Sequence, residues 1–475
     1  MTPIDLRAGI SIDADVAVAG GGAAGVAAAV TAARRGMRVV LVERYGFCGG
    51  GAVAGMSGTV CGLYAASDRP HAHPEQVVFG FADEFVRLLE RRGGITPPVR
   101  YGKTFTRVHD PLVWREAADH LLSEAGVRVF LHATVTEALV DGDRVCGLVA
   151  STKQGKLAIR ARITIDASGD ADVLAMAGMP SLVGDDGRVQ NPTMIFRLGG
   201  VDTARFLRAY GADTIMPQEV SALLRRHDGK GYALPRAKIW LFTTTRPGEL
   251  LCNCTRVVGP DGRELNTLYA ADFTEAETAG RRQVREYARF FRDHLAGCEA
   301  SWVNDTGVQV GVRQTRQGRG VALLANADVV RGAKFADAIA RSPWPIELHA
   351  GARPRVEWLL DDWYEVPYGC FVPARGEGLL FAGRCLSAEH EAVASARVTA
   401  QCFAYGHAVG HAAAMCIEAG CEPRALRGEE LRARLNQDGA QLGAAGALTR
   451  TGVRGTGADR TAPDDAAHHP PAGDA

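Results

Sequence analysis

The segment FAGRCLSAEHEAVASARV, residues 381–398, gathers side chains that can do acid–base chemistry. His390 and Glu391 are adjacent, and an imidazole beside a carboxylate can act as a general base or position a substrate. A short apolar strand runs into Gly383 just before them, and an Ala-rich helix follows. We expect both residues to stand on the loop between strand and helix. There they either take part in a reaction or stabilise the loop by hydrogen bonds.

The start of this last helix is a second place where charge can be stabilised. Ser395 is placed to cap the helix, because a serine side chain accepts hydrogen bonds from the first free backbone N–H groups. The N–H groups of Arg397 and Val398 would then point at whatever lies above the helix. We expect this whole segment to run as one long helix, residues 391–420.

Three glycines near the start of the chain have the GxGxxG spacing of a phosphate-binding turn. In DADVAVAGGGAAGVAAA, Gly20 permits a tight turn, Gly22 lets a diphosphate approach the backbone, and Gly25 lets the helix pack on the sheet. Glu43 ends the next strand, RVVLVE, where a carboxylate accepts hydrogen bonds from both hydroxyls of an unphosphorylated ribose. The pattern favours a dinucleotide site over a glycine-rich turn with only a structural role.

The choice between FAD and NAD depends on features outside this turn. A second glycine cluster, residues 49–51 in RYGFCGGGAVAG, follows Glu43 and offers another backbone surface to a diphosphate and a ribityl chain. The strand ITIDASGD ends in the small residues Ala167, Ser168 and Gly169. A nicotinamide dehydrogenase has no need of these extra features, so they favour FAD.

The elements that position these residues follow from hydrophobic periodicity. Residues 16–44 read as strand, helix and strand, and PLVWREAADHLLSEAG, residues 111–126, is a helix with a proline in its first turn. Residues 127–169 alternate like a strand, a meander and a buried strand. EAETAGRRQVREYARFFRDHL indicates a further helix.

Changes in amino-acid composition along the chain indicate how it divides into domains. We expect a dinucleotide-binding domain in two parts, residues 14–190 and 363–425, around an inserted substrate domain at residues 191–362, which has more aromatic and charged residues. Residues 439–475 are rich in Gly, Ala, Asp and Pro, which predicts a disordered tail.

Composition excludes several classes of function. The 54 basic residues balance the 54 acidic ones without a basic block, so we expect no nucleic-acid or membrane partner. The 11 cysteines lack CxxC pairs, and residues 1–15 lack an apolar signal segment, which together favour a cytoplasmic protein with reduced thiols. No His or Cys cluster has metal-ligand spacing, so we expect no metal. The oligomeric state is left open.

The ordered blocks GGGAAG, ERYGFCGGGAVAG, ITIDASGDADVLAMAG, VGVRQTR, WPIELH, YEVPYGCFVP and AGRCLSAEHEAVASARV resemble a bacterial family of FAD-dependent oxidoreductases in the glutathione-reductase-like superfamily. The family is distantly similar to fumarate reductase flavoproteins. The resemblance implies an α/β fold: a Rossmann-like FAD/NAD(P)-binding domain with three-layer ββα architecture and an inserted α+β substrate domain. It also implies FAD, held without a covalent bond.

The resemblance assigns cofactor contacts to residues that match the family's blocks. Many flavoproteins of the superfamily place an Asp after the Gly of the last strand, where this chain has Arg384. In related flavoproteins the last helix begins at the flavin pyrimidine edge. The implied cofactor-binding residues are Gly20, Gly22, Ala24, Gly25, Glu43, Arg44, Gly49, Gly50, Gly51, Val135, Ala167, Ser168, Gly169, Asp170, Gly383, Arg384 and Val398.

Candidate catalytic residues come from both domains. By analogy with fumarate reductase-like flavoproteins, Arg397 binds a substrate carboxylate; its alternative is a structural pairing with Glu391 or Asp170. His349 in WPIELH and Arg313 in VGVRQTR are further candidates from the inserted domain. The predicted catalytic residues are His390, Glu391, Arg397, His349 and Arg313.

Three functions remain open from the sequence. The first is hydride transfer between a small organic substrate and FAD, with an unknown electron donor or acceptor. The second is a flavin-dependent monooxygenase or halogenase, although the WxWxIP motif is only partly present in SPWPIE. The third is a protein in which FAD is structural or sensory and which chiefly binds a partner.

Overall fold

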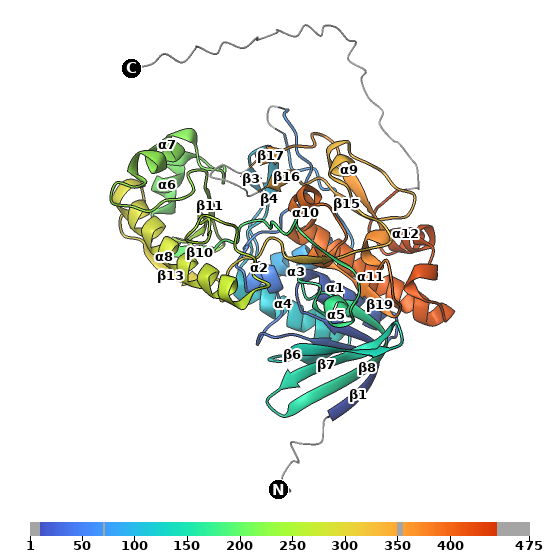
Figure 1. Ribbon diagram of the computed structural model, residues 1–475. Helices are drawn as coiled ribbons and strands as arrows, with labels where there is room; N and C mark the ends of the chain where they lie inside the picture. Colours follow the sequence, from blue (N-terminus) through green and yellow to red (C-terminus); the bar gives the residue numbers. More distant parts are fainter. Residues whose placement is uncertain (1–9, 70–71, 349–354, 444–475) are drawn as a thin grey trace, which may run out of the picture.

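A central sheet of seven strands organises the molecule. The computed structural model (Figure 1) describes residues 10–69, 72–348 and 355–443. The strand order is β5-β2-β1-β8-β7-β6, and β19 pairs with the second half of β8. The strands are β1 (Ile10–Ala19), β2 (Val39–Val42), β5 (Arg128–Phe130), β6 (Thr134–Asp141), β7 (Arg144–Thr152), β8 (Gly155–Asp166) and β19 (Leu379–Phe381).

The parallel part of this sheet sets the position of the predicted dinucleotide turn. Strand β1 lies between β2 and β8, with Val18 opposite Leu41 on one side and Ile165 on the other. Residues 16–19 of β1 and the whole of β2 are apolar and buried, because both faces of a parallel sheet are covered. Their carboxyl ends meet at one edge, where α/β folds bind ligands. The prediction of an α/β, Rossmann-like fold is confirmed.

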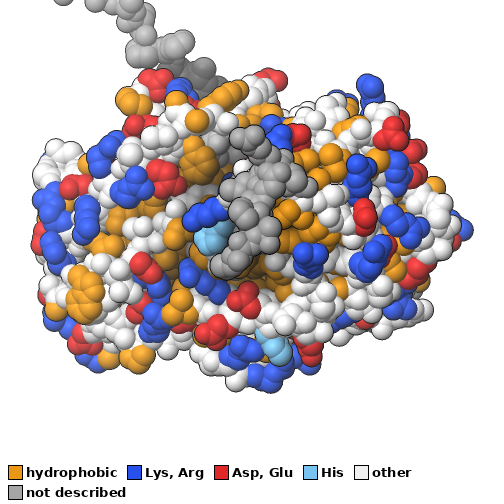
Figure 2. All heavy atoms as spheres, turned by 90° about the horizontal axis from the view of Figure 1, so that it is seen from below, with side chains coloured by type: hydrophobic (Ala, Val, Ile, Leu, Met, Phe, Trp, Pro, Cys, Tyr) orange, Lys and Arg blue, Asp and Glu red, His pale blue; other side chains and the backbone are white. Residues whose placement is uncertain are grey.

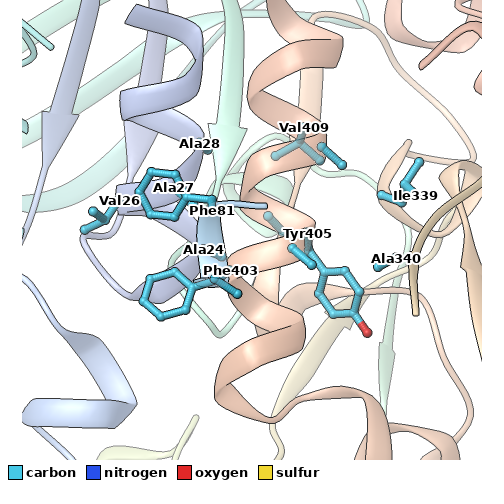
Figure 3. Close-up of a cluster of buried hydrophobic side chains, with 14 of the residues drawn as sticks. Ala24, Val26, Ala27, Ala28, Phe81, Ile339, Ala340, Phe403, Tyr405 and Val409 are labelled. Atoms are coloured by element: carbon cyan, nitrogen blue, oxygen red, sulfur yellow. The ribbon is translucent and has the colours of Figure 1, made fainter. Parts of the chain in front are cut away.

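Helices α1 (Ala23–Arg34) and α11 (Thr399–Ala419) lie side by side against the sheet (Figure 1). Small residues line their contact, since each helix must approach the other closely. Figure 3 shows Ala24 and Ala28 on the side of α1 that faces α11, and the Phe403 ring of α11 lies 5.8 Å from that of Phe81. This packing holds the amino ends of both helices at the same edge of the sheet.

We predict that Gly406→Ala destabilises the protein although alanine is the better helix former. A Cβ atom at Gly406 would stand 2.1 Å from the carbonyl oxygen of Ala24, so α11 must move away from α1. Overpacking of this kind costs about 1–3 kcal/mol, more than the gain of about 1 kcal/mol in helix propensity. Urea unfolding followed by circular dichroism measures the change. Both variants are measured as apoproteins, because Gly51 lines the cavity; Gly51→Ala, with no heavy atom within 4 Å of its added Cβ, is the control and should not lower the free energy of unfolding.

A second, antiparallel sheet forms a separate lobe, green to yellow in Figure 1. Its order is β11-β12-β10-β13, and it has its own buried core with Phe290 and Phe291 at the centre. It lies within the predicted substrate domain, whose exact bounds stay a prediction. The elements of this lobe are β10 (Phe196–Gly199), α6 (Thr203–Tyr210), α7 (Gln218–His227), β11 (Trp240–Thr243), β12 (Leu250–Asn253), α8 (Ala270–His294) and β13 (Trp302–Thr306).

Shorter elements connect the two lobes and cover the large sheet. Four strand pairs are antiparallel: β3 (Val99–Tyr101) with β4 (Thr104–Thr106), β9 (Ser181–Val183) with β14 (Arg316–Gly318), β15 (Ala338–Ser342) with β18 (Tyr364–Pro367), and β16 (Ile346–Leu348) with β17 (Arg355–Glu357). The remaining helices are α2 (Gly50–Val53), α3 (Phe81–Arg91), α4 (Pro111–Glu124), α5 (Asp172–Met176), α9 (Asn326–Val330), α10 (His390–Ala396) and α12 (Gly428–Gln437).

The prediction of one long helix capped by Ser395 is wrong. The chain forms α10, breaks at residues 397–398, and starts again as α11, whose N-cap is Val398. Ser395 lies inside α10, and its hydroxyl bonds to the carbonyl of Trp344 at 2.6 Å and to the hydroxyl of Tyr364 at 2.8 Å. Because its hydroxyl is bonded to these buried partners, the Ser395 side chain does not cap a helix. His390 begins α10, so it does not stand on a loop.

The surface charge and the length of the helices concern the expectation of no nucleic-acid or membrane partner. Figure 2 shows a face on which acidic and basic side chains are interspersed. Within the described ranges, no helix combines the length and apolar character needed to cross a bilayer. Of the predicted disordered tail, residues 444–475 lie outside the described part of the chain.

Candidate functional site

One cavity begins at the carboxyl edge of the parallel strands and reaches the second sheet. The cavity has a volume of about 320 Å³. The turn after β1, the end of β2 and residues 167–169 line its outer part. Phe242 of β11 and Asn253 of β12 line its inner part. The cavity therefore joins the predicted dinucleotide turn to the antiparallel lobe.

The glycines of the first turn have distinct structural duties. Gly20 has φ +97°, and a Cβ there would lie 2.5 Å from the carbonyl oxygen of Ala167, so only glycine fits. A Cβ on Gly25 would lie 1.8 Å from the carbonyl oxygen of Gly20. Gly22 differs, because its nearest neighbour would be Gly50 Cα at 3.8 Å. Gly22 thus leaves open space at the amino end of α1, a cradle that suits a diphosphate.

Glu43 is buried at the end of β2 and ties the glycine turn to the next strand. Its carboxylate accepts hydrogen bonds from the backbone N–H groups of Gly21 at 2.7 Å and Tyr45 at 2.9 Å. Burial raises the pKa of Glu43, while these two amides oppose the rise. The carboxylate also lines the cavity, and its oxygens have lone pairs for further donors. Its contact with a ribose stays a prediction.

Arg384, which replaces the usual Asp after the last strand, forms a half-buried ion pair beside the cavity. Its Nη2 lies 2.9 Å from Asp170 Oδ1, and its Nη1 donates to the Thr315 hydroxyl at 3.0 Å. Burial would raise the pKa of Asp170, but the Arg384 guanidinium and the Thr315 hydroxyl hold it below its usual value. Asp170 is therefore the partner of Arg384, and its suggested pairing with Arg397 is wrong.

The inner part of the cavity contains charged groups from several loops. Tyr101 donates its hydroxyl proton to Glu347, with oxygen distances of 3.0 and 3.1 Å. Arg313 donates to the backbone carbonyl of Asn191 at 2.6 Å, and Arg397 donates to the side-chain carbonyl of Gln190 at 3.2 Å. Burial and the Glu347 charge raise the pKa of Tyr101 well above its usual range, so its hydroxyl keeps its proton.

Aromatic side chains form one wall of this inner part. The Tyr101 ring lies 5.1 Å from that of Trp344 and 6.2 Å from that of Phe242, measured between centroids. Trp240 packs behind them, 6.2 Å from Tyr101, with the Arg236 guanidinium 4.4 Å from its ring. The inner cavity is thus apolar on one side and charged on the other.

Two cysteines of the cavity are neutral thiols. Burial raises the pKa of Cys61 to about 11 and that of Cys402 to about 12. Cys61 hydrogen-bonds to the hydroxyls of Thr59 and Thr106. Because the thiolate is the reactive form, neither cysteine is a nucleophile near neutral pH.

Most predicted site residues line the cavity, and a few lie elsewhere. Glu391 pairs with Arg355 at 2.5 Å, and neither it nor His390 lines the cavity. His349 lies outside the described residues. Gly25 and Asp170 pack behind the cavity wall. The predicted residues in the wall are Gly20, Gly22, Ala24, Glu43, Arg44, Gly49, Gly50, Gly51, Val135, Ala167, Ser168, Gly169, Arg313, Gly383, Arg384, Arg397 and Val398.

Sequence reasoning missed part of the inner cavity. Trp344 and Glu347 lie in the segment SPWPIELH, which also contains His349. This segment was singled out in the sequence, but only His349 in it was predicted as a site residue. Tyr101 comes from a two-stranded hairpin without a recognisable motif. Arg236 precedes β11 and reaches the site only through the tertiary fold.

A separate cluster outside the cavity joins the last two helices. His407 and His411 of α11 place Nε2 atoms 2.7 and 2.9 Å from the same oxygen of Asp438. These three residues are close enough to hold a metal ion. However, Arg35 Nη1 lies 3.3 Å from His411 Nδ1 and can only donate, so the ring proton of a neutral His411 is on Nε2. That arrangement suits a hydrogen bond to Asp438, and we assign the cluster a structural role.

Solved structures share the architecture. A geranylgeranyl bacteriochlorophyll reductase-like protein from Thermoplasma acidophilum superposes with a TM-score of 0.50 at 13% identity, over 90% of this chain and 84% of its own. The flavin-dependent brominase Bmp2 gives 0.47 at 14% identity, over 89% and 84%. The p-nitrophenol 4-monooxygenase PnpA from Pseudomonas putida gives 0.42 at 14%, again over 89% and 84%. At 13% identity, the likeness to the first of these structures shows the fold alone.

The family of the chain follows from its sequence match together with this cavity. No curated protein matches the sequence. The model of one family, described as FAD dependent oxidoreductase, matches residues 15–435. The Gly22 cradle, the buried Glu43 and the second glycine cluster fit the adenosine diphosphate half of FAD, which is the cofactor. The chain belongs to the FAD dependent oxidoreductase family.

Proposed function

We propose that this protein catalyses hydride transfer between a small organic substrate and non-covalently bound FAD. One observation carries the proposal: a single cavity connects the glycine cradle to an inner part that contains Arg313, Arg397, Glu347 and Tyr101. When bound, FAD supplies the two-electron chemistry, and the protein supplies orientation and charge. The inner part is charged on one side and aromatic on the other, which allows it to orient a small molecule.

The residues of the inner cavity have separable roles in this proposal. Tyr101 keeps its proton and is held by Glu347, so the pair can deliver or accept a proton at the Tyr101 oxygen. Val398 and Thr399 line the cavity at the amino end of α11. The positive end of this 21-residue helix stabilises negative charge that develops nearby. This role, earlier expected of a helix beginning near Ser395, falls to α11.

The proposal is tested by an anaerobic redox experiment on the purified yellow protein. Flavin that is released on denaturation shows non-covalent binding. Dithionite-reduced protein should then be reoxidised by an organic acceptor without oxygen. Stoichiometric incorporation of oxygen into a product would overturn the proposal in favour of a monooxygenase. A flavin that no metabolite reduces or reoxidises, in a protein that co-purifies with a partner, would overturn it in favour of a binding or sensory role.

Tyr101→Phe removes the proposed proton at the inner cavity and keeps the ring. We expect turnover to fall by about 10²–10⁴-fold, the usual contribution of a general acid or base, while the flavin content is unchanged. Stopped-flow measurement of flavin absorbance during turnover gives the rate. Tyr269→Phe, at an exposed tyrosine remote from the cavity wall, is the control. Unchanged turnover in Tyr101→Phe removes this hydroxyl from the mechanism.

A further inference from the structure

We propose that the substrate is a small organic acid, with its carboxylate between Arg313 and Arg397 and its apolar body against Trp344 and Phe242. The inference rests on the proposed function, because it names the class of molecule that occupies the inner cavity. The inference also rests on the burial and charge of the arginine side chains and on the aromatic wall of the inner cavity.

Three guanidinium groups surround the inner cavity. Arg313 is 6% exposed and Arg236 is 3% exposed, while Arg397 is half-buried. Arg313 and Arg397 line the cavity directly, and Arg236 stands behind Trp240. Within the described residues, Arg397 Nε is buried without a hydrogen-bond partner. A buried donor without a partner is costly, and an acceptor in the cavity would satisfy it.

The charges on these groups do not balance among the described residues that act on Arg313. Burial lowers the pKa of Arg313, and the charges of Arg236 and Arg397 lower it further. Glu347 is the carboxylate that opposes this effect. Burial also lowers the pKa of Arg397 to about 10, so the group is still charged at neutral pH. Arg313 therefore lies near two other guanidinium groups and one carboxylate that opposes them, and an anion bound beside it would offset the repulsion among the cations.

The phosphates of the cofactor have their own place in the cavity. The Gly22 cradle lies at the amino end of α1, and Arg44, which lines the same outer part, donates to Gln309. Backbone N–H groups at a helix start are sufficient to bind a diphosphate. Arg313 and Arg397 belong instead to the part lined by Phe242 and Trp344. The substrate is therefore the anion that fits between them.

The neighbouring wall indicates an organic acid rather than an inorganic anion. Trp344, Phe242 and Tyr101 present ring surface to the same space. A bare phosphate or sulfate gains nothing from such a wall, whereas an apolar body attached to a carboxylate is removed from water there. Guanidinium groups match a carboxylate in geometry, since they donate two parallel hydrogen bonds.

A binding experiment on the FAD-loaded protein tests the inference without turnover. Each acid of a panel is compared with its neutral amide by titration of the flavin absorbance: acetate with acetamide, succinate with succinamide, and benzoate with benzamide. Inorganic phosphate is included. We expect at least one acid to bind about tenfold or more tightly than its amide, since a charge-assisted bidentate contact is lost in the amide. Amides that bind as well as their acids, or phosphate that binds more tightly than every acid, would overturn the inference.

The binding of acids by arginine variants then tests whether Arg313 and Arg397 hold the carboxylate. Arg313→Gln and Arg397→Gln should each weaken the favoured acid about tenfold or more and leave its amide unchanged. Arg341→Gln is a matched control, because Arg341 is also partly buried and also donates to one backbone carbonyl, that of Leu442, but lies outside the cavity wall. Equal loss in all three variants would overturn the assignment. If a variant loses FAD, the acid–amide difference in the unchanged protein still decides the question, and it does so even if no turnover is found.

Discussion

Gly22→Val should abolish tight FAD binding while the apoprotein stays folded. Gly22 has φ −69°, which any residue adopts, and a Cβ there meets nothing closer than Gly50 Cα at 3.8 Å. The valine methyl groups would therefore enter the space above the amino end of α1, where we expect the diphosphate to bind. Loss of one or two charge-assisted hydrogen bonds to the phosphates weakens binding about 100-fold or more.

The experiment measures the flavin-to-protein ratio after purification and the FAD dissociation constant of the apoprotein. Gly22→Ala gives a graded comparison, because one methyl group displaces the diphosphate less than an isopropyl group does. The free energy of unfolding of both apoproteins should fall by no more than about 1 kcal/mol, the usual effect of replacing a preferred N-cap residue, because Gly22 is the N-cap of α1. A Val variant with full flavin content would show that the phosphates do not approach Gly22.

The three glycines of one motif illustrate what the sequence can predict. GxGxxG spacing correctly indicated a turn from β1 into α1, and the apolar strands around it indicated a parallel sheet, because these features are local and periodic. How far each of Gly20, Gly22 and Gly25 tolerates an added Cβ atom cannot be read from the local sequence. It depends on Ala167, which approaches the turn from a strand far away in the chain. Only the folded sheet reveals which glycine faces the cavity.

The last helix shows where local reasoning failed. Ser395 has the right type and place for a helix cap, yet its hydroxyl is occupied by Trp344 and Tyr364 from distant segments. The same long-range packing brings Tyr101 and Glu347 together from different hairpins. Neither contact has a signature in residue spacing. The residues that line the outer part of the cavity were therefore predictable as a group, and the lining of the inner part was predicted only at Arg313 and Arg397.

Asp170→Asn should lower the free energy of unfolding by about 3 kcal/mol at pH 7, because it leaves the Arg384 guanidinium half-buried without its counter-charge. Asp170 and Arg384 side chains are each 17% exposed, so water screens the pair only in part. Asp185→Asn is the matched control: its ion pair with Arg188 is 54% and 69% exposed, and such surface pairs contribute about 0–1 kcal/mol.

The pH dependence of this difference separates charge from packing. Arg384 holds the pKa of Asp170 below its ordinary value, which is also its value in the unfolded chain, about 3.9. The stabilisation is therefore complete well above about pH 4 and is lost as the pH falls through that range toward the folded-state pKa. Urea unfolding at about pH 7 and about pH 3.5 should show a smaller gap between the original protein and Asp170→Asn at the lower pH. A gap that stays constant would mean that Asp170 acts through shape and hydrogen bonding to Thr315, and that its charge does not hold Arg384 in place beside the cofactor.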